Sequence, residues 1–321
     1  MLTRRELGRL ALTAPAAALF GSRAMWAAAR PDSKIEGVQI GLIAPYSFGR
    51  DATDADAILK NLVELGISAV ELQDRPAEAA AGAPAIPGFG GPGGPGGRRE
   101  LTPEQRAERE AAQDALRKWR LSASMDGFTA LRKKYNDAGV HIYAFKLPLT
   151  AAMSDDEYAY TFQVAQALGA DHITMELPTD GTLTRRIGDF AATRKMRVAY
   201  HTHEQGSLTA FDEALAQSPW NAINVDIGHY VAGTSESPVP LFLKHPTRFA
   251  SIHLKDRKKG KGPNMPWGQG DTPITEVLQL MKKHRWTFPA TIELEYPVPE
   301  GSTRVAEIGK CLAYCRAALT T

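Results

Sequence analysis

Eight short segments rich in β-branched and other apolar residues alternate along the chain with amphipathic segments of helical periodicity, and this alternation restricts the fold more than any other feature. The predicted strands span residues 38–44, 67–73, 140–147, 172–177, 197–203, 222–227, 250–255 and 290–295. Apolar residues at helical spacing predict helices over residues 54–65, 155–168, 208–217 and 274–283. Such alternation indicates a parallel sheet with crossover helices.

Eight repeats in about 290 residues fit a closed (β/α)8 barrel, and the predicted fold class is therefore α/β, a TIM barrel. A doubly wound open sheet is the alternative, but the first strand is not followed by a Gly-x-Gly-x-x-Gly turn. We expect residues 30–321 to form a single barrel domain with an insertion at 76–120, between the second and third strands.

Residues 1–29 have the pattern of a twin-arginine (Tat) signal peptide. Arg4 and Arg5 precede an apolar stretch rich in Ala and Leu, which ends in small residues at Ala27 to Ala29. Pro15 interrupts this stretch, which is shorter than the roughly 20 apolar residues of a membrane-spanning helix, so no stable membrane anchor is expected. The pattern predicts a periplasmic or exported protein that uses the Tat export machinery. This route suits a protein that takes up a metal or cofactor in the cytoplasm, and it disfavours phosphorylated sugars as substrates.

The insertion begins with a Gly- and Pro-dense segment, residues 76–100, for which we predict a loop. The residues after it favour a helix, with Thr102 as N-cap and Pro103 at the first helical position. Together they lengthen a connection on the side of the barrel where active-site loops lie. We expect a passive insertion, with a lid as the alternative.

Charge and cysteine content exclude several classes of partner. Lys and Arg total 38 against 36 acidic residues, a net charge of +2, which does not favour nucleic acid or an anionic membrane. The basic run at 255–261 lacks interleaved aromatic residues, so we interpret it as a solvated loop. Cys311 and Cys315 lie one helical turn apart and are predicted to be packed helix residues rather than a disulfide.

Ionisable residues gather where the last five predicted strands end. These residues are Glu176; His201, His203 and Glu204; Asp226 and His229; His253, Lys255, Asp256 and Arg257; and Glu293 and Glu295. Catalytic side chains of (β/α)8 barrels come from these carboxyl ends, and burying so many charges is costly unless they pair or bind a cation. Two or three carboxylates with one imidazole predict one divalent metal ion, preferably Mn²⁺ or Mg²⁺, with Co²⁺ or Zn²⁺ as alternatives.

The segments NVDIGHYVAG, FASIHLKDRKKG, PWGQGDTPITEVLQLMKKHRW and FPATIELEYP resemble the xylose isomerase-like barrels, which include sugar isomerases and epimerases, inosose dehydratases and class II apurinic endonucleases. The resemblance extends over residues 38–318 and implies a metal held by Glu, Asp, His and Glu from separate strands. Asp226, His253 and Glu293 match the last three ligands. The first ligand is Glu176, or else His201, which stands where many epimerases carry the glutamate.

We favour Glu176 as the first ligand because Met175 and Leu177 beside it are apolar and Pro178 ends the strand. The three-metal apurinic endonucleases would need further histidines on the second and third strands, which end in Gln73 and Leu147. A three-zinc site and a nucleic-acid substrate are therefore not expected.

The family resemblance implies a mechanism of proton abstraction next to a carbonyl. Glu176 and Glu293 are the expected acid and base, and His201 and His203 are expected to transfer protons or orient carboxylates. His229, Lys146, Lys255 and Arg257 are the expected substrate-binding residues. Glu71 and Glu295 are expected to be local ion-pair partners.

The predicted function is a divalent-metal-dependent sugar isomerase or epimerase that acts through an enediolate on a small sugar or keto-sugar. One alternative is a dehydratase or lyase on keto-sugars or 3-keto-glycosides, because the same intermediate can expel a leaving group. A second alternative is a metal-dependent, endonuclease-like hydrolase, and the last is a sugar-binding protein. The pattern leaves the substrate and the oligomeric state open.

Overall fold

The structure of the protein, a computed structural model, describes residues 30–49, 52, 54–87 and 101–321. The predicted signal peptide and most of the Gly- and Pro-dense segment lie outside these residues. Residues 31–321 form one compact unit.

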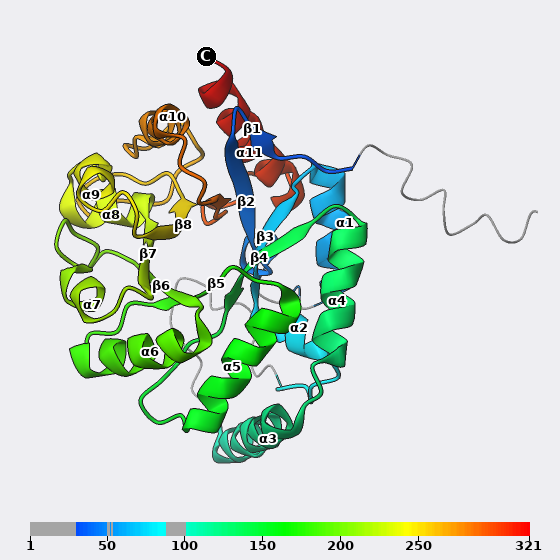
Figure 1. Cartoon of the computed structure of the whole chain (residues 1–321). Coiled ribbons are helices and arrows are strands. Elements are labelled where there is room, and N and C mark those ends of the chain that lie inside the picture. The colour runs from blue at the N-terminus through cyan, green and yellow to red at the C-terminus, as the bar shows by residue number, and fades with distance from the viewer. Residues whose placement is uncertain (1–29, 50–51, 53, 88–100) are drawn as a thin grey trace, which may run out of the picture. The chain divides into compact units, whose positions relative to one another are not determined.

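Eight parallel strands close into a barrel, and Figure 1 labels most of them. They are β2 (Val38–Ala44), β3 (Ala69–Gln73), β4 (His141–Lys146), β5 (His172–Glu176), β6 (Arg197–Thr202), β7 (Asn221–Asp226), β8 (Phe249–Leu254) and β9 (Ala290–Ile292). Each strand pairs with the next, and β2 pairs with β9, with Ile40 opposite Ala290, so the eight strands form a closed ring. A two-residue strand, β1 (Lys34–Ile35), adds to β2 in the antiparallel direction. The predicted (β/α)8 barrel is confirmed.

Helices connect the strands and surround the barrel (Figure 1). They are the 3₁₀ helix η2 (Tyr46–Phe48), α1 (Ala55–Leu65), α2 (Asp74–Ala80), α3 (Pro103–Ser122), α4 (Asp126–Asp137), α5 (Asp155–Leu168), α6 (Gly181–Arg194), α7 (Asp212–Gln217), α8 (Ile227–Thr234), α9 (Val239–Lys244), α10 (Ile274–His284) and α11 (Arg304–Thr320). Thr102 caps α3 as predicted, with Gln105 completing a capping box. Among the described residues, no helix is long and apolar enough to cross a membrane.

The prediction of a loop over residues 76–100 is wrong at its start, because residues 76–80 belong to α2. Its sequence is rich in Ala, and Pro76 lies in the first turn, where proline is tolerated. The helix is fixed from outside by Arg120 of α3, whose Nε lies 2.7 Å from Glu78 Oε1. Cys311 and Cys315 are buried and free within α11, as expected.

A large side chain, Tyr143, fills part of the barrel interior. The Tyr143 ring lies against Gly41, where a Cβ atom would come within 2.8 Å of it. The Tyr143 hydroxyl forms a 2.5 Å hydrogen bond with Thr291 Oγ1 across the interior.

Candidate active site

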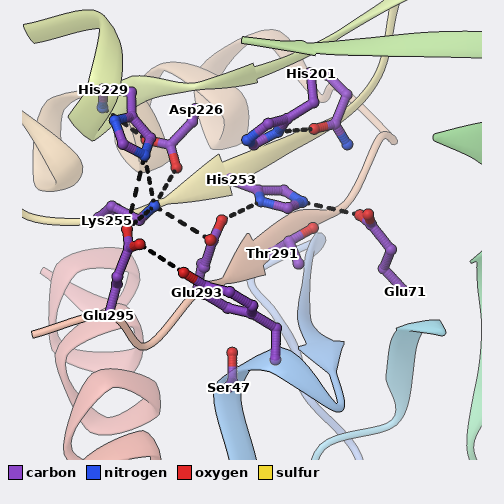
Figure 2. Close-up of polar contacts among 12 residues, drawn as sticks. Ser47, Glu71, His201, Asp226, His229, His253, Lys255, Thr291, Glu293 and Glu295 are labelled. Carbon is purple, nitrogen blue, oxygen red and sulfur yellow. Dashed lines mark hydrogen bonds and ion pairs between the residues drawn. The ribbon is translucent and has the colours of Figure 1, made fainter. Parts of the chain in front are cut away.

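Four ionisable side chains meet at the carboxyl ends of β6 to β9 (Figure 2). His201 is on β6, Asp226 ends β7, His253 is on β8, and Glu293 follows β9 directly. Each offers a possible ligand atom, and these atoms all lie within 4.8 Å of one another. The four side chains are buried, with exposed fractions between 0% for Asp226 and 6% for Glu293. A buried cluster of two carboxylates and two imidazoles can bind a metal ion.

His253 is held between two carboxylates. Its Nδ1 lies 2.5 Å from Glu293 Oε2, and its Nε2 lies 2.9 Å from Glu71 Oε2. Burial lowers the pKa of His253, but the charges of Glu71 and Glu293 outweigh burial and raise the pKa to about 9. Burial likewise raises the pKa of Glu71, but the charge of His253 reverses this effect and lowers the pKa to about 2. His253 is therefore an imidazolium in the metal-free protein.

Glu71 is the expected ion-pair partner, and it pairs with a residue on the far side of the barrel. The carboxylate comes from β3, is fully buried, and also accepts a 2.7 Å hydrogen bond from Thr174 Oγ1. A carboxylate bonded to Nε2 leaves Nδ1 of His253 as the nitrogen that faces Glu293 and the rest of the cluster. Carboxylates in this position orient histidine ligands in metal sites.

His201 is the neutral imidazole of the cluster. Its pKa is well below the usual value, first because the side chain is buried and then because Lys146 and His253 carry positive charge. Its Nδ1 lies 2.9 Å from Asn224 Oδ1, which can only accept a hydrogen bond. Nδ1 thus carries the proton, and Nε2 retains the lone pair that a metal ion requires.

Lys255 places a buried ammonium group beside the cluster (Figure 2). Its Nζ lies 3.1 Å from Asp226 Oδ2, 3.2 Å from Glu293 Oε1 and 2.5 Å from Glu295 Oε2. Burial lowers the pKa of Lys255, but the three carboxylates outweigh burial and raise it, so the ammonium stays charged. Glu295 is the ion-pair partner that was expected, and it also accepts a 2.5 Å hydrogen bond from the Tyr46 hydroxyl.

Asp226 has two separate roles through its two oxygens. Oδ1 accepts a 2.8 Å hydrogen bond from the backbone N–H of His229 and caps α8. Among the described residues, Oδ2 has the ion pair with Lys255 but no hydrogen bond. The cap fixes the carboxylate, and Oδ2 remains directed at the cluster.

Glu176, the preferred first ligand, lies next to the four-residue cluster rather than within it. Its side chain is 44% exposed, with Oε1 3.1 Å from Lys146 Nζ and Oε2 3.3 Å from His203 Nδ1. It forms a second possible ligand group with His201 and His203. The geometry therefore favours His201, the alternative first ligand, as the companion of Asp226, His253 and Glu293.

The remaining predicted substrate-binding residues lie on the other side of Lys255. His229 Nε2 lies 3.0 Å from Lys255 Nζ, and His229 Nδ1 lies 2.6 Å from Arg257 Nη1. Arg257 is buried and bound to the Gly262 carbonyl and to Glu204, at 2.7 Å and 3.0 Å. Arg257 thus contacts the Nδ1 side of His229, and His229 and Lys255 lie beside the cluster.

Two polar residues of the site were not predicted from the sequence as site residues, namely the histidine-orienting Glu71 and the His201 partner Asn224. Glu71 interrupts the otherwise apolar start of β3, and Asn224 precedes Asp226 by two residues on β7. Alternation along a strand places Asn224 on the same face as Asp226, and this signal could have identified it.

Comparisons with known proteins agree with this architecture. The family model of the xylose isomerase-like TIM barrel matches residues 110–315. A sugar phosphate isomerase/epimerase from Parabacteroides distasonis superposes with a TM-score of 0.58 at 15% identity, covering 89% of this chain and 96% of that one. D-psicose 3-epimerase from Clostridium cellulolyticum gives a TM-score of 0.57 at 10% identity, covering 88% and 99%.

The probable 3-DHS dehydratase of petrobactin synthesis from Bacillus anthracis superposes with a TM-score of 0.58 at 14% identity, again covering 88% and 99% of the two chains. At such identities these likenesses show the fold alone. A search of curated proteins found no match. From the family match over residues 110–315, the chain belongs to the xylose isomerase-like TIM barrel family.

Proposed function

We propose that the protein is a divalent-metal-dependent sugar isomerase or epimerase that removes a proton next to a substrate carbonyl and acts through an enediolate. One observation carries this proposal: His201, Asp226, His253 and Glu293 present four buried ligand atoms within 4.8 Å of one another where the barrel strands end. The solved sugar phosphate isomerase/epimerase and D-psicose 3-epimerase, which share this fold, support a sugar-like substrate.

The donor set fits a divalent cation. Asn224 leaves the Nε2 lone pair of His201 available, Glu71 turns Nδ1 of His253 towards Glu293, and Asp226 Oδ2 has no hydrogen bond among the described residues. Two imidazoles with two carboxylates suit Mn²⁺, Co²⁺ or Zn²⁺ better than Mg²⁺, which prefers oxygen ligands. A cation held there would polarise the substrate carbonyl as a Lewis acid.

We assign the proton transfers to two glutamates on different sides of the cluster. Glu176 comes from β5, and Lys146 and His203 hold its carboxylate at the more exposed rim. Glu293 follows β9 and is buried beside Lys255 and His253. A proton removed by one carboxylate and returned by the other at the opposite face of the same carbon gives epimerisation, and return to the adjacent carbon gives isomerisation.

The charges around the cluster favour an uncharged substrate. The negative charge of the carboxylates exceeds the positive charge of the lysine and arginine side chains there, even when the two charges of a divalent metal are added. The carboxylates are Glu71, Glu176, Glu204, Asp226, Glu293 and Glu295, and the cations are Lys146, Lys255 and Arg257. A free sugar or keto-sugar suits this balance better than a sugar phosphate. Lys255 and His229 are placed to hydrogen-bond its hydroxyl or carbonyl oxygens.

The position of His203 favours a second candidate, a dehydratase or lyase on keto-sugars or 3-keto-glycosides. Its side chain is 52% exposed, binds Glu176, and lies with its ring centroid 4.6 Å from that of His229. An exposed imidazole beside the expected base can protonate a leaving group on a neighbouring carbon. Free keto-glycosides would be available to an exported enzyme, and Tat-dependent export, which rests on residues 1–29, is part of this proposal.

The test is metal analysis of the purified protein, followed by proton exchange with deuterated water on a panel of sugars and 3-keto-glycosides. We expect about one divalent metal per chain, lost in Asp226→Asn and His253→Ala and retained in His141→Ala, an exposed histidine at the opposite barrel mouth. Metal-dependent exchange without loss of a leaving group supports the isomerase or epimerase. Exchange with elimination assigns the lyase, and a wild type that binds no metal refutes both.

A further inference from the structure

We infer that a hydrogen-bonded row of buried side chains, from His172 through Ser251 and Asn224 to His201, sets the tautomer of His201 and thereby its capacity to ligate a metal. Asn224 and Ser251 are positioning residues in this inference, which rests on the proposed metal site. The four residues come from four strands, β5, β8, β7 and β6.

The row is continuous and closed to solvent. Asn224 Oδ1 lies 2.9 Å from His201 Nδ1, and Asn224 Nδ2 donates to Ser251 Oγ at 2.6 Å. Ser251 Oγ lies 2.9 Å from His172 Nε2. Asn224 and Ser251 are fully buried, and the two histidines are at most 3% exposed. No change at one end can therefore be compensated by bulk water.

The orientation of the Asn224 amide sets the polarity at the His201 end of the row, because an amide oxygen only accepts and an amide nitrogen only donates. In the first polarity His201 Nδ1–H donates to Asn224 Oδ1, and Asn224 Nδ2 donates to Ser251 Oγ. In the second polarity the amide is turned over, Asn224 Nδ2 donates to His201 Nδ1, and His201 carries its proton on Nε2. Only the first polarity leaves His201 Nε2 free for a metal ion, and the orientation of Asn224 is that of the first.

The far end of the row is His172. Burial lowers the pKa of His172 to about 4, so its ring is neutral, and its Nε2 can accept from or donate to Ser251 Oγ. His172 lines a cavity of about 530 Å³ together with residues at the amino ends of β6 and β8, including Arg197 and Phe249. The row thus links a histidine at one barrel mouth to the candidate metal site at the other.

The first experiment measures the affinity of metal-free protein for Mn²⁺ and Co²⁺ by calorimetry. We expect Asn224→Leu to weaken the affinity by about 10–100-fold, because His201 loses the acceptor that fixes its tautomer. Asn224→Asp restores an acceptor and should recover most of the affinity. The matched control is Asn221→Leu, which removes a buried asparagine of the same strand whose amide bonds Thr184 and Ala214 instead of the site. Equal affinity in the Asn224→Leu and Asn221→Leu proteins overturns the inference.

The second experiment reads the tautomers directly and needs no substituted core. Nitrogen NMR of ¹⁵N-histidine-labelled wild type, metal-free and with diamagnetic Zn²⁺, should show a protonated Nδ1 and an unprotonated Nε2 in His201. The reverse pattern overturns the inference, even if every Asn224 variant fails to fold. A wild type that binds no metal refutes the proposed function, whereas the tautomers of the metal-free protein test the hydrogen-bonded row separately.

Discussion

The imidazolium of His253 should make the metal-free protein lose stability as the solution becomes alkaline. Burial lowers the pKa of this group, but the charges of Glu71 and Glu293 outweigh burial, so folding raises the pKa from 6.5 to about 9. A group with a raised folded-state pKa contributes its full stabilisation below the unfolded pKa. That contribution is lost as the pH rises through the folded pKa, so the window runs from pH 6.5 to about 9.

The magnitude follows from the same two values. Each tenfold change in proton affinity corresponds to about 1.4 kcal/mol, so a pKa raised from 6.5 to about 9 is worth about 3 kcal/mol of unfolding free energy. The low pKa of Glu71 reflects the same interaction and is not added to this value. Saturation with metal should reverse the sign, because metal binding displaces the His253 proton and becomes stronger at higher pH.

The assay is urea unfolding of chelator-treated protein followed by circular dichroism at pH 6.5, 7.5 and 9. His253→Gln provides the comparison, because it keeps every other titrating group and lacks the imidazolium. The wild type should lose about 3 kcal/mol more than this variant across the range. His141→Gln, at the opposite mouth, should behave as the wild type. A wild-type profile parallel to that of His253→Gln refutes the assignment of a buried imidazolium.

Three further predictions concern folding and metal content. Arg120→Met should cost about 2 kcal/mol in chemical denaturation because the buried Glu78 carboxylate loses its ion pair and keeps only the hydrogen bond from Tyr160, whereas Arg117→Met, on the exposed side of the same helix, should cost clearly less. Gly228→Ala should destabilise the fold by about 1–3 kcal/mol and lower metal content, because a Cβ atom there would lie 2.5 Å from the Lys255 carbonyl oxygen. Removing the metal with a chelator should lower the unfolding free energy by about 3 kcal/mol relative to protein kept at 100 times the dissociation constant, as measured by thermal unfolding.

Part of the site could be predicted because parallel strands bring their carboxyl ends together. Asp226, His253 and Glu293 lie within one residue of the carboxyl ends of three successive strands, and Asp226 lies directly opposite His253 in the sheet register. Locating the strands was therefore enough to predict that these residues converge. Locating the strands does not decide which residue is the fourth member, because Glu176 and His201 are direct register partners on neighbouring strands. The local sequence places both residues at the same level of the barrel.

The amino-acid sequence by itself determined the order and location of the barrel strands, the capped start of α3 and the edge of the sheet where charges gather. These features depend on periodicity and on the properties of residues a few positions apart. Only the tertiary structure decided that Lys146 and His203 hold Glu176 at the rim, that Glu71 reaches His253 across the barrel, and that Asn224 orients His201. These contacts depend on the direction in which each side chain points inside the closed barrel. Glu71 and His253 are separated by 182 positions in the chain, so no local pattern specifies that they meet.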